Sequence, residues 1–243
     1  AYAIMSARSE KEYTAVFSHL RDAAFSFDGI IRTPKNATTD FEKAMRRAIS
    51  KVWPQVTVFG CNFHLCQAIH RKAVSMESLS TKVSGNSIHH KVLKMFMRLS
   101  LLPLNRIEAG HQALIQFINS SPELSKDFFE FIDYFERTWI NRFPKEEWCT
   151  SSRARRSNND LEGYNRFIKQ FIPLHPGPWV FVDGLLDLAN DASANLQADQ
   201  TRGILFRPDR SFITKPLEKA LIELQQSKID ELDFLNRMAT RIF

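Results

Sequence analysis

Strand and helix patterns alternate over residues 1–75, and this alternation is the feature that most limits how the chain can fold. The segment Val56–Phe59 contains β-branched residues in alternation and predicts a strand, which Gly60 ends. Apolar side chains recur at helical spacing before this strand, up to Val52, and after it, from Phe63 onward. Strands and helices that follow one another in this way are typical of an α/β layer.

Two further strands are expected nearer the start of the chain. Tyr2–Met5 is a short apolar run that suits a strand, and Gly29–Thr33 is a second candidate. Helical periodicity begins between them, at about Ser9. Pro34–Thr38 then interrupts the pattern, and Asp40 stands where the next helix begins.

Beyond residue 75 the strand signals fade and helical periodicity dominates. Three helices are predicted before residue 150: His90–Leu101, Arg106–Ile118 and Leu124–Trp139. We expect this block to be an insertion in the α/β domain, because a polar-faced helix over Asn158–Phe171 follows it. Two more helices are predicted, at Trp179–Leu196 and Lys215–Met238.

The predicted organisation has four parts. Residues 1–75 form the first part of a core, 76–150 a helical insertion, 151–172 the return to the core, and 173–243 a C-terminal helical segment. The expected fold class is α/β in architecture and helix-rich, α+β in content.

Composition narrows the class of protein. The chain has a net charge of +6, which is compatible with an anionic partner but also common in proteins that never bind nucleic acid. Three cysteines are too few for a disulfide framework and favour an intracellular protein. No apolar run approaches the roughly 18 residues of a membrane span. The chain lacks a Gly-rich phosphate loop, a Gly-x-Ser-x-Gly elbow and a His-Glu-x-x-His motif, which argues against nucleotide hydrolases, serine hydrolases and metalloproteases.

Asp40 lies between a candidate strand and a helix, where α/β folds collect catalytic groups. The competing interpretation is helix capping, in which Thr38, Thr39 or Asp40 accepts a hydrogen bond from the first helical amides. Glu42 is expected to be an exposed acid that complements the helix dipole.

Cys61 and His64 stand one helical turn apart, directly after the predicted strand. A Cys-x-x-His pair is half of a tetrahedral zinc site, and Cys66 and His70 are the nearest further ligands. We favour the alternative, in which a buried thiol and a hydrogen-bonded histidine hold the corner between strand and helix.

Glu162 lies at the boundary between the apolar stripe and the polar face of its predicted helix, near Arg166 and Lys169. Glutamates on a polar helix face are usually only solvated, but this one has cations around it. The preceding run Arg153-Ala154-Arg155-Arg156 could contact phosphates, serve nuclear import or coat a loop. Phosphate contact suits it best beside a metal-binding acid, because arginine offers planar, bidentate donors.

The order of these segments resembles the transposase domain of Mutator-like elements, the MULE domain, within the class of DDE transposases. Thr39-Asp40-Phe41-Glu42 resembles the block around the family's second catalytic aspartate. Gly60-Cys61-Asn62-Phe63-His64 resembles its Cys-x-x-His block. Ser157-Asn158-Asn159 with Leu161-Glu162-Gly163 resembles the block that carries its catalytic glutamate. Tyr2–Met5 resembles the strand before the family's first long helix, so the likeness covers most of the chain.

The resemblance implies a partial RNase H-like core that a helical insertion interrupts. It also implies a parent enzyme that cleaves and transfers DNA strands at transposon ends with two Mg²⁺ ions. Asp40 and Glu162 would be the catalytic and metal-binding residues, with Cys61 and His64 in support. The expected DNA-binding residues are basic: Arg153, Arg155, Arg156, Arg166 and Lys169.

The family's first catalytic aspartate would lie upstream of Tyr2–Met5. We therefore expect this chain to lack the first strands of the core and to be inactive by itself. DNA is the expected partner and the nucleus the expected location, while homo-oligomerisation is left open. The alternative function is that of a domesticated transposase, retained as a DNA-binding or scaffold protein without catalysis. A helical interaction domain with accidental motifs is a third interpretation, in which Asp40 and Glu162 would lie far apart.

Overall fold

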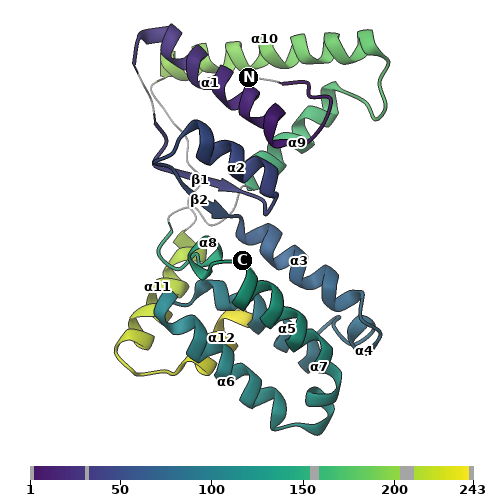
Figure 1. Cartoon of the computed structure of the whole chain (residues 1–243), viewed down its shortest axis with the longest axis vertical. Coiled ribbons are helices and arrows are strands. Elements are labelled where there is room, and N and C mark those ends of the chain that lie inside the picture. Colours follow the sequence, from purple (N-terminus) through teal and green to yellow (C-terminus); the bar gives the residue numbers. More distant parts are fainter. Residues whose placement is uncertain (1–2, 31–32, 154–158, 203–210, 241–243) are drawn as a thin grey trace. The chain divides into compact units, whose positions relative to one another are not determined.

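The computed structural model describes residues 3–30, 33–153, 159–202 and 211–240 of the chain (Figure 1). These residues divide into two compact units. One unit contains helices α9 (Asn159–Phe171) and α10 (Pro178–Arg202), and the other contains both strands and the remaining helices.

Helix α1 (Glu10–Asp28) opens the larger unit and starts where the sequence predicts it. Its first turn is capped reciprocally: the Ser9 hydroxyl accepts a hydrogen bond from the Glu12 N–H, and the Ser9 N–H donates to the Glu12 carboxylate. Tyr13 and Phe17 of α1 stack with centroids 6.2 Å apart, and Phe17 also contacts Trp53 at 6.0 Å. These aromatic contacts join α1 to the end of helix α2 (Lys43–Val52).

Two short strands form a parallel pair. In the pairing of β1 (Asn36–Thr39) with β2 (Thr57–Gly60), Asn36 lies opposite Thr57 and Thr39 opposite Gly60. Helix α2 is the crossover between them, so β1, α2 and β2 form a βαβ unit, as Figure 1 shows. The expected alternation of strand and helix is therefore present in this part of the chain. Because the strands are parallel, their carboxyl ends meet at one edge.

A block of helices follows the sheet. Its elements are α3 (Asn62–Val74), α4 (Glu77–Ser80), α5 (Ile88–Arg98), η1 (Leu99–Leu101), η2 (Leu104–Arg106), α6 (Ile107–Asn119), α7 (Pro122–Phe135), η3 (Glu136–Arg142) and α8 (Lys145–Trp148). The three long helices predicted in this region are confirmed, as α5, α6 and α7. Helices α11 (Ser211–Gln225) and α12 (Glu231–Ala239) belong to the same unit.

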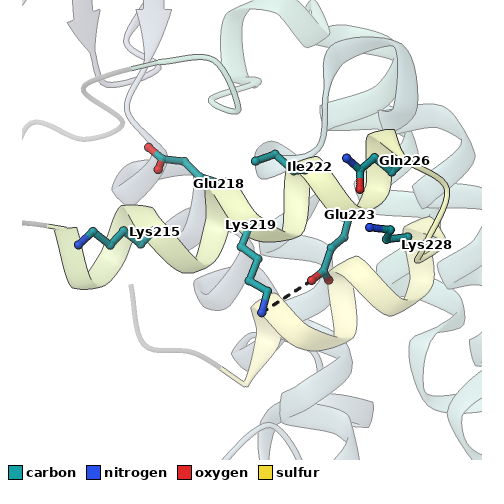
Figure 2. A pocket seen from close by; sticks show the side chains of 7 residues that line it. All are labelled: Lys215, Glu218, Lys219, Ile222, Glu223, Gln226 and Lys228. Carbon is teal, nitrogen blue, oxygen red and sulfur yellow. Dashed lines mark ion pairs between the residues drawn. The ribbon is translucent and has the colours of Figure 1, made fainter.

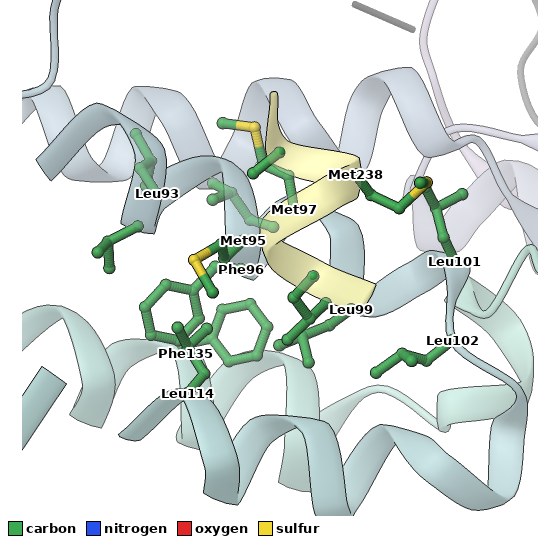
Figure 3. Packing of buried hydrophobic residues seen from close by; sticks show 14 of the residues in the cluster. Leu93, Met95, Phe96, Met97, Leu99, Leu101, Leu102, Leu114, Phe135 and Met238 are labelled. Carbon is green, nitrogen blue, oxygen red and sulfur yellow. The ribbon is translucent and has the colours of Figure 1, made fainter. Parts of the chain in front are cut away.

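Helix α5 lies at the centre of the apolar core. Seven of its eleven residues are buried, so neighbouring elements cover it on most sides. Figure 3 shows Met238 of α12 close to side chains of α5 and η1, with Leu114 of α6 and Phe135 of α7 in the same cluster. The Arg98 Nε donates a 3.3 Å hydrogen bond to the Met238 carbonyl, which satisfies a buried cation at the end of α5.

Helices α9 and α10 pack closely in the smaller unit. A Cβ atom at Gly184 would lie 2.6 Å from Cγ1 of Ile172, so glycine is needed for this approach. The edge of the Phe167 ring meets Phe171 on α9, with centroids 4.9 Å apart. The polar-faced helix predicted over Asn158–Phe171 is thus present as α9, from Asn159.

Two strand predictions near the start of the chain are wrong in their described residues. Gly29, Ile30 and Thr33 are not in a strand, and β1 lies instead within and just after Pro34–Thr38, the segment predicted as a break. The reason is that β1 has little apolar pattern of its own and depends on pairing with β2. Ala3–Met5 is likewise not a strand. Tyr2, the first residue of the predicted strand Tyr2–Met5, lies outside the described residues.

The helix predicted over Lys215–Met238 is two helices. Helix α11 ends at Gln225, and Ser227 has a φ of 54°, which breaks the helical path. Helix α12 then begins after Asp230, whose carboxylate accepts a 2.7 Å hydrogen bond from the Asp233 N–H. The helix-rich α+β content agrees with the predicted class. The RNase H-like assignment and the four-part division at residues 75, 150 and 172 stay predictions.

His111 of α6 is a titratable group enclosed by aromatic side chains. Its side chain is 1% exposed, and its ring stacks on Phe135 with centroids 5.7 Å apart. Neither ring nitrogen has a hydrogen-bond partner among the described residues, and a Glu136 carboxylate oxygen lies 3.9 Å from Nε2. Burial lowers the pKa of His111, an effect larger than the opposing charge of Glu108.

Acidification from pH 7 to pH 5 should therefore destabilise the protein through His111. The unfolded chain binds a proton near pH 6.5, whereas the folded chain binds it only at lower pH, so the free energy of unfolding falls as pH falls below about 6.5. The limiting slope for one such group is about 1.4 kcal/mol per pH unit. Urea unfolding at several pH values should show this slope in the parent and a smaller one in His111→Met, whose side chain is apolar and similar in size.

His70 provides the control position because it is exposed. His70→Met should retain the parent slope. An unchanged slope in His111→Met would mean that other groups cause the acid sensitivity.

Candidate functional site

The parallel pairing of β1 and β2 brings two predicted site residues to one edge. Asp40 directly follows β1 and Cys61 directly follows β2. The Cys61 N–H donates a 2.7 Å hydrogen bond to the Thr39 carbonyl, which extends the pairing to the last residue of β1. The carboxyl edge of parallel strands is where α/β folds place functional groups, and Asp40 and Cys61 both lie there.

The Asp40 carboxylate is held by the turn between β1 and α2. Its Oδ1 accepts a 3.0 Å hydrogen bond from the Glu42 N–H, and its carbonyl accepts a 2.8 Å bond from the Thr39 hydroxyl. Asp40 is half-buried, so the turn orients the carboxylate without enclosing it. The capping interpretation is correct in part: Asp40 accepts an amide hydrogen bond, but the N-cap residue of α2 is Glu42, which makes no side-chain capping bond.

Glu42 and Tyr13 form a polar contact beside this turn. The Tyr13 hydroxyl donates a 3.1 Å hydrogen bond to Glu42 Oε2. Burial raises the pKa of Tyr13, and the hydrogen bond and charge of Glu42 and the charge of Asp40 raise it further. Tyr13 is therefore a protonated donor at neutral pH that lies within the field of two acids. The sequence does not predict this hydrogen bond, because the helical spacing of Tyr13 indicates only a residue on the apolar face of its helix.

Phe41 fixes the residue next to Asp40. A Cβ atom at Gly60 would lie 2.2 Å from Cζ of Phe41, so the ring rests directly on the backbone at the end of β2. The other contacts of this ring are edge-on, to Trp139 at 5.0 Å and Phe143 at 5.3 Å between centroids. Gly60 thus permits a close approach that locks the β1–α2 turn against η3. In the sequence, Gly60 predicts only the end of a strand, and its position directly after the strand is the one signal for this close contact.

The Cys61–His64 pair has the surroundings of a structural corner. The Cys61 side chain is fully buried, and burial raises the pKa of the nearby Cys66 thiol to about 11. Among the described residues, neither cysteine belongs to a group of three Cys, His, Asp or Glu ligand atoms that lie within 4.8 Å of one another. A zinc site of Cys61, His64, Cys66 and His70 is therefore not supported. The predicted hydrogen bond of the histidine is also missing at Nδ1 of His64, which is buried and has no partner among the described residues.

Arg153 is tied to the end of β2. Its Nη1 donates a 3.2 Å hydrogen bond to the Gly60 carbonyl, and its Nη2 donates a 2.9 Å bond to the Glu146 carbonyl. The guanidinium carbon lies 3.8 Å from the centroid of the Phe59 ring. Burial lowers the pKa of Arg153 to about 10, which leaves the group charged at neutral pH. Arg153 thus anchors the segment that precedes α9, and its role in DNA binding stays a prediction.

The remaining predicted residues belong to the segment around α9. Glu162 lies in α9, but its side chain is outside the part that the structure describes, as are Arg155 and Arg156. Arg166 and Lys169 are exposed. They are three residues apart, so they share one face of α9. Because α9 and Asp40 lie in different units, the predicted pairing of Asp40 with Glu162 is not tested.

Among the described residues, one group of three side chains has the proximity that a metal ion requires. The ligand atoms of His89, Glu123 and Asp127 all lie within 4.8 Å of one another. Asp127 Oδ2 lies 2.8 Å from His89 Nε2 and forms an ion pair with Lys82, whose hydrogen bond is the main factor that lowers the pKa of Asp127. Lys82 thus already supplies a positive charge to this carboxylate. The sequence gives no ligand spacing that would link His89 to Glu123 and Asp127.

In comparisons with known proteins, one family model matches part of the chain. A family model described as the MULE transposase domain matches residues 1–68, so the predicted resemblance is confirmed for this segment. No curated protein and no solved structure matches the chain. The match covers 68 of the 243 residues. None of the described helices has both the length and the apolar character needed to cross a membrane.

Replacing Gly60 by alanine should destabilise the larger unit. The added methyl group would overlap the Phe41 ring. The shifts needed to accommodate such a group typically lower the free energy of unfolding by about 1–3 kcal/mol. Urea unfolding followed by tryptophan fluorescence should show a lower midpoint for Gly60→Ala.

The Phe41→Leu background isolates the cause. A shorter side chain removes the overlap, so Gly60→Ala should cost clearly less there, and the two substitutions should not be additive. Equal costs in both backgrounds would show that the Phe41–Gly60 contact is not the reason for the loss.

Proposed function

We propose, from the match of residues 1–68 to the MULE transposase domain, that the chain is the catalytic region of a metal-dependent DNA transposase. In this proposal the core is RNase H-like, residues 76–150 are its helical insertion, and the protein acts in the nucleus. The observation that carries the proposal is the position of Asp40. It follows the first strand of a parallel βαβ unit, at the edge where such folds place catalytic groups.

Asp40 and Glu162 are the proposed metal-binding residues. Carboxylate oxygens suit Mg²⁺, which prefers hard oxygen ligands, and the half-buried Asp40 carboxylate is compatible with a hydrated ion of this kind. Two bound divalent cations would stabilise the charge on the attacking and leaving oxygens of a phosphodiester. The hydrogen bond from the Glu42 amide and the packing of Phe41 on Gly60 would keep the Asp40 carboxylate oriented.

The surroundings of the proposed site divide into structural and DNA-binding side chains. Tyr13 is a protonated donor near Asp40, and Cys61 and Arg153 secure the end of β2. We propose that four basic residues before and within α9 hold phosphates: Arg155, Arg156, Arg166 and Lys169. Of these, Arg166 and Lys169 are exposed on α9.

The central test is whether Asp40 and Glu162 bind the same ion. Mn²⁺, a spectroscopic substitute for Mg²⁺, can be titrated into the chain and its dissociation constant measured by electron paramagnetic resonance. Asp40→Asn and Glu162→Gln should each weaken binding at least about tenfold, which is about 1.4 kcal/mol. The double variant should be little weaker than either single variant, because the first substitution already removes the shared ion.

Two controls separate this site from others. Glu123→Gln removes a ligand from the group at His89, Glu123 and Asp127 and should leave the Asp40–Glu162 coupling intact. Glu218→Gln changes an exposed acid on α11 and should have no effect. Losses that add in full, or that are absent, would contradict a shared ion. DNA binding without such coupling would favour the second candidate, a retained DNA-binding or scaffold protein without catalysis.

A further inference from the structure

A pocket of about 540 Å³ lies beside the turn that carries Asp40, and its lining is strongly basic. Its polar lining comes from α2, the end of η3 and α8: Lys43, Arg46, Arg47, Ser50, Arg142 and Glu147. These residues define the basic pocket. With four cationic side chains and one carboxylate, the lining of this pocket has a net positive charge.

The charges of the basic pocket are unequally compensated. Arg46 forms an ion pair with Glu147 and donates a 3.3 Å hydrogen bond to the Val58 carbonyl, so it is a structural member of the wall. Lys43 and Arg142 form no ion pair with any described residue, and both are exposed. Arg47 is exposed, and its ion pair with Glu10 spans 3.9 Å between exposed side chains, so it contributes little. Lys43, Arg47 and Arg142 are therefore exposed cations that remain available to an anionic ligand.

The polar side chains of α2 in this pocket form a row that begins near Asp40 in the chain. Lys43, Arg47 and Ser50 follow one another at four- and three-residue steps, so they share one face of the helix. The helix starts three residues after Asp40. Arg142 approaches from η3, where its guanidinium carbon lies 5.9 Å from the centroid of the Phe143 ring. Phe143 itself stacks on Trp139, which gives this wall a rigid support.

We propose that the basic pocket binds consecutive phosphates of a DNA strand and sets the path of that strand toward Asp40; the second half of this inference rests on the proposed function. Arginine and lysine are the side chains that neutralise backbone phosphates, and arginine can bind them bidentately. A single small anion would need fewer cations, whereas several spread along a helix face match the repeating charge of a nucleic acid. The Ser50 hydroxyl supplies a neutral donor at the far end of the row.

A second pocket, of about 420 Å³, offers a matched contrast within the same unit. Figure 2 shows its three lysines, Lys215, Lys219 and Lys228, together with Glu218 and Glu223. Lys219 pairs with Glu223 at 3.9 Å, as the dashed line in Figure 2 marks. Two carboxylates thus offset most of its positive charge. Removal of three cations from this pocket changes the net charge of the protein as much as removal of three from the basic pocket.

The test compares two triple variants of the full chain. Lys43→Ala/Arg47→Ala/Arg142→Ala empties the basic pocket, and Lys215→Ala/Lys219→Ala/Lys228→Ala is the charge-matched control. Binding of duplex and single-stranded DNA is measured by fluorescence anisotropy between about 50 and 200 mM salt. The basic-pocket variant should bind at least about 30-fold more weakly and lose about three units of salt slope on duplex DNA, whereas the control should lose less than about threefold. Unfolding midpoints of both variants establish that they are folded.

The outcomes separate this inference from the proposed function. Equal losses in the two triple variants, or no loss in the basic-pocket variant, would overturn the assignment of this pocket while leaving the proposed transposase function in place. Absence of DNA binding by the parent chain would overturn both. The Mn²⁺ coupling of Asp40 and Glu162 is measured without DNA, so its failure would count against the proposed catalytic site and leave the pocket assignment standing.

Discussion

The parallel pairing of β1 with β2 is the interaction on which the rest of the candidate site depends. It aligns Thr39 with Gly60, so the residues that follow, Asp40 and Cys61, meet at one edge. The pairing also creates the narrow space above Gly60 into which the Phe41 ring fits. A sheet of two short strands has little stability of its own, and here helices cover it and side chains clamp its end. The position of Asp40 is therefore a product of tertiary packing as much as of strand geometry.

The clamp at the end of β2 joins segments that are distant in sequence. Arg153 reaches the Gly60 carbonyl across 93 residues, and Arg46 reaches Glu147 across 101. These contacts tie the βαβ unit to α8, the last helix of the block, and to Arg153 just after it. Asp40 and Glu162 belong to different units, so their common function is carried by the proposal alone.

Charge is distributed unevenly over the larger unit. In the helical block, Asp127 is matched by Lys82 and His89, and Arg46 of α2 is matched by Glu147 of α8. On the exposed face of α2, by contrast, cations lack comparable partners. Exposed like charges repel one another weakly and contribute nothing to folding, so their clustering beside a sheet edge favours a role in binding.

The sequence by itself determined the long helices, the strand at β2 and the likeness of residues 1–68 to a transposase family, because helical periodicity and the order of short motifs are local properties of the chain. It placed Asp40 correctly at a strand–helix junction but put the strand too early, since β1 is defined by its partner. Only the tertiary structure decided that Phe41 packs on Gly60, that Arg153 serves the end of β2, and that Arg142 joins the cations of α2. The physical reason is that these contacts link residues tens of positions apart, and no local pattern records which of them will meet.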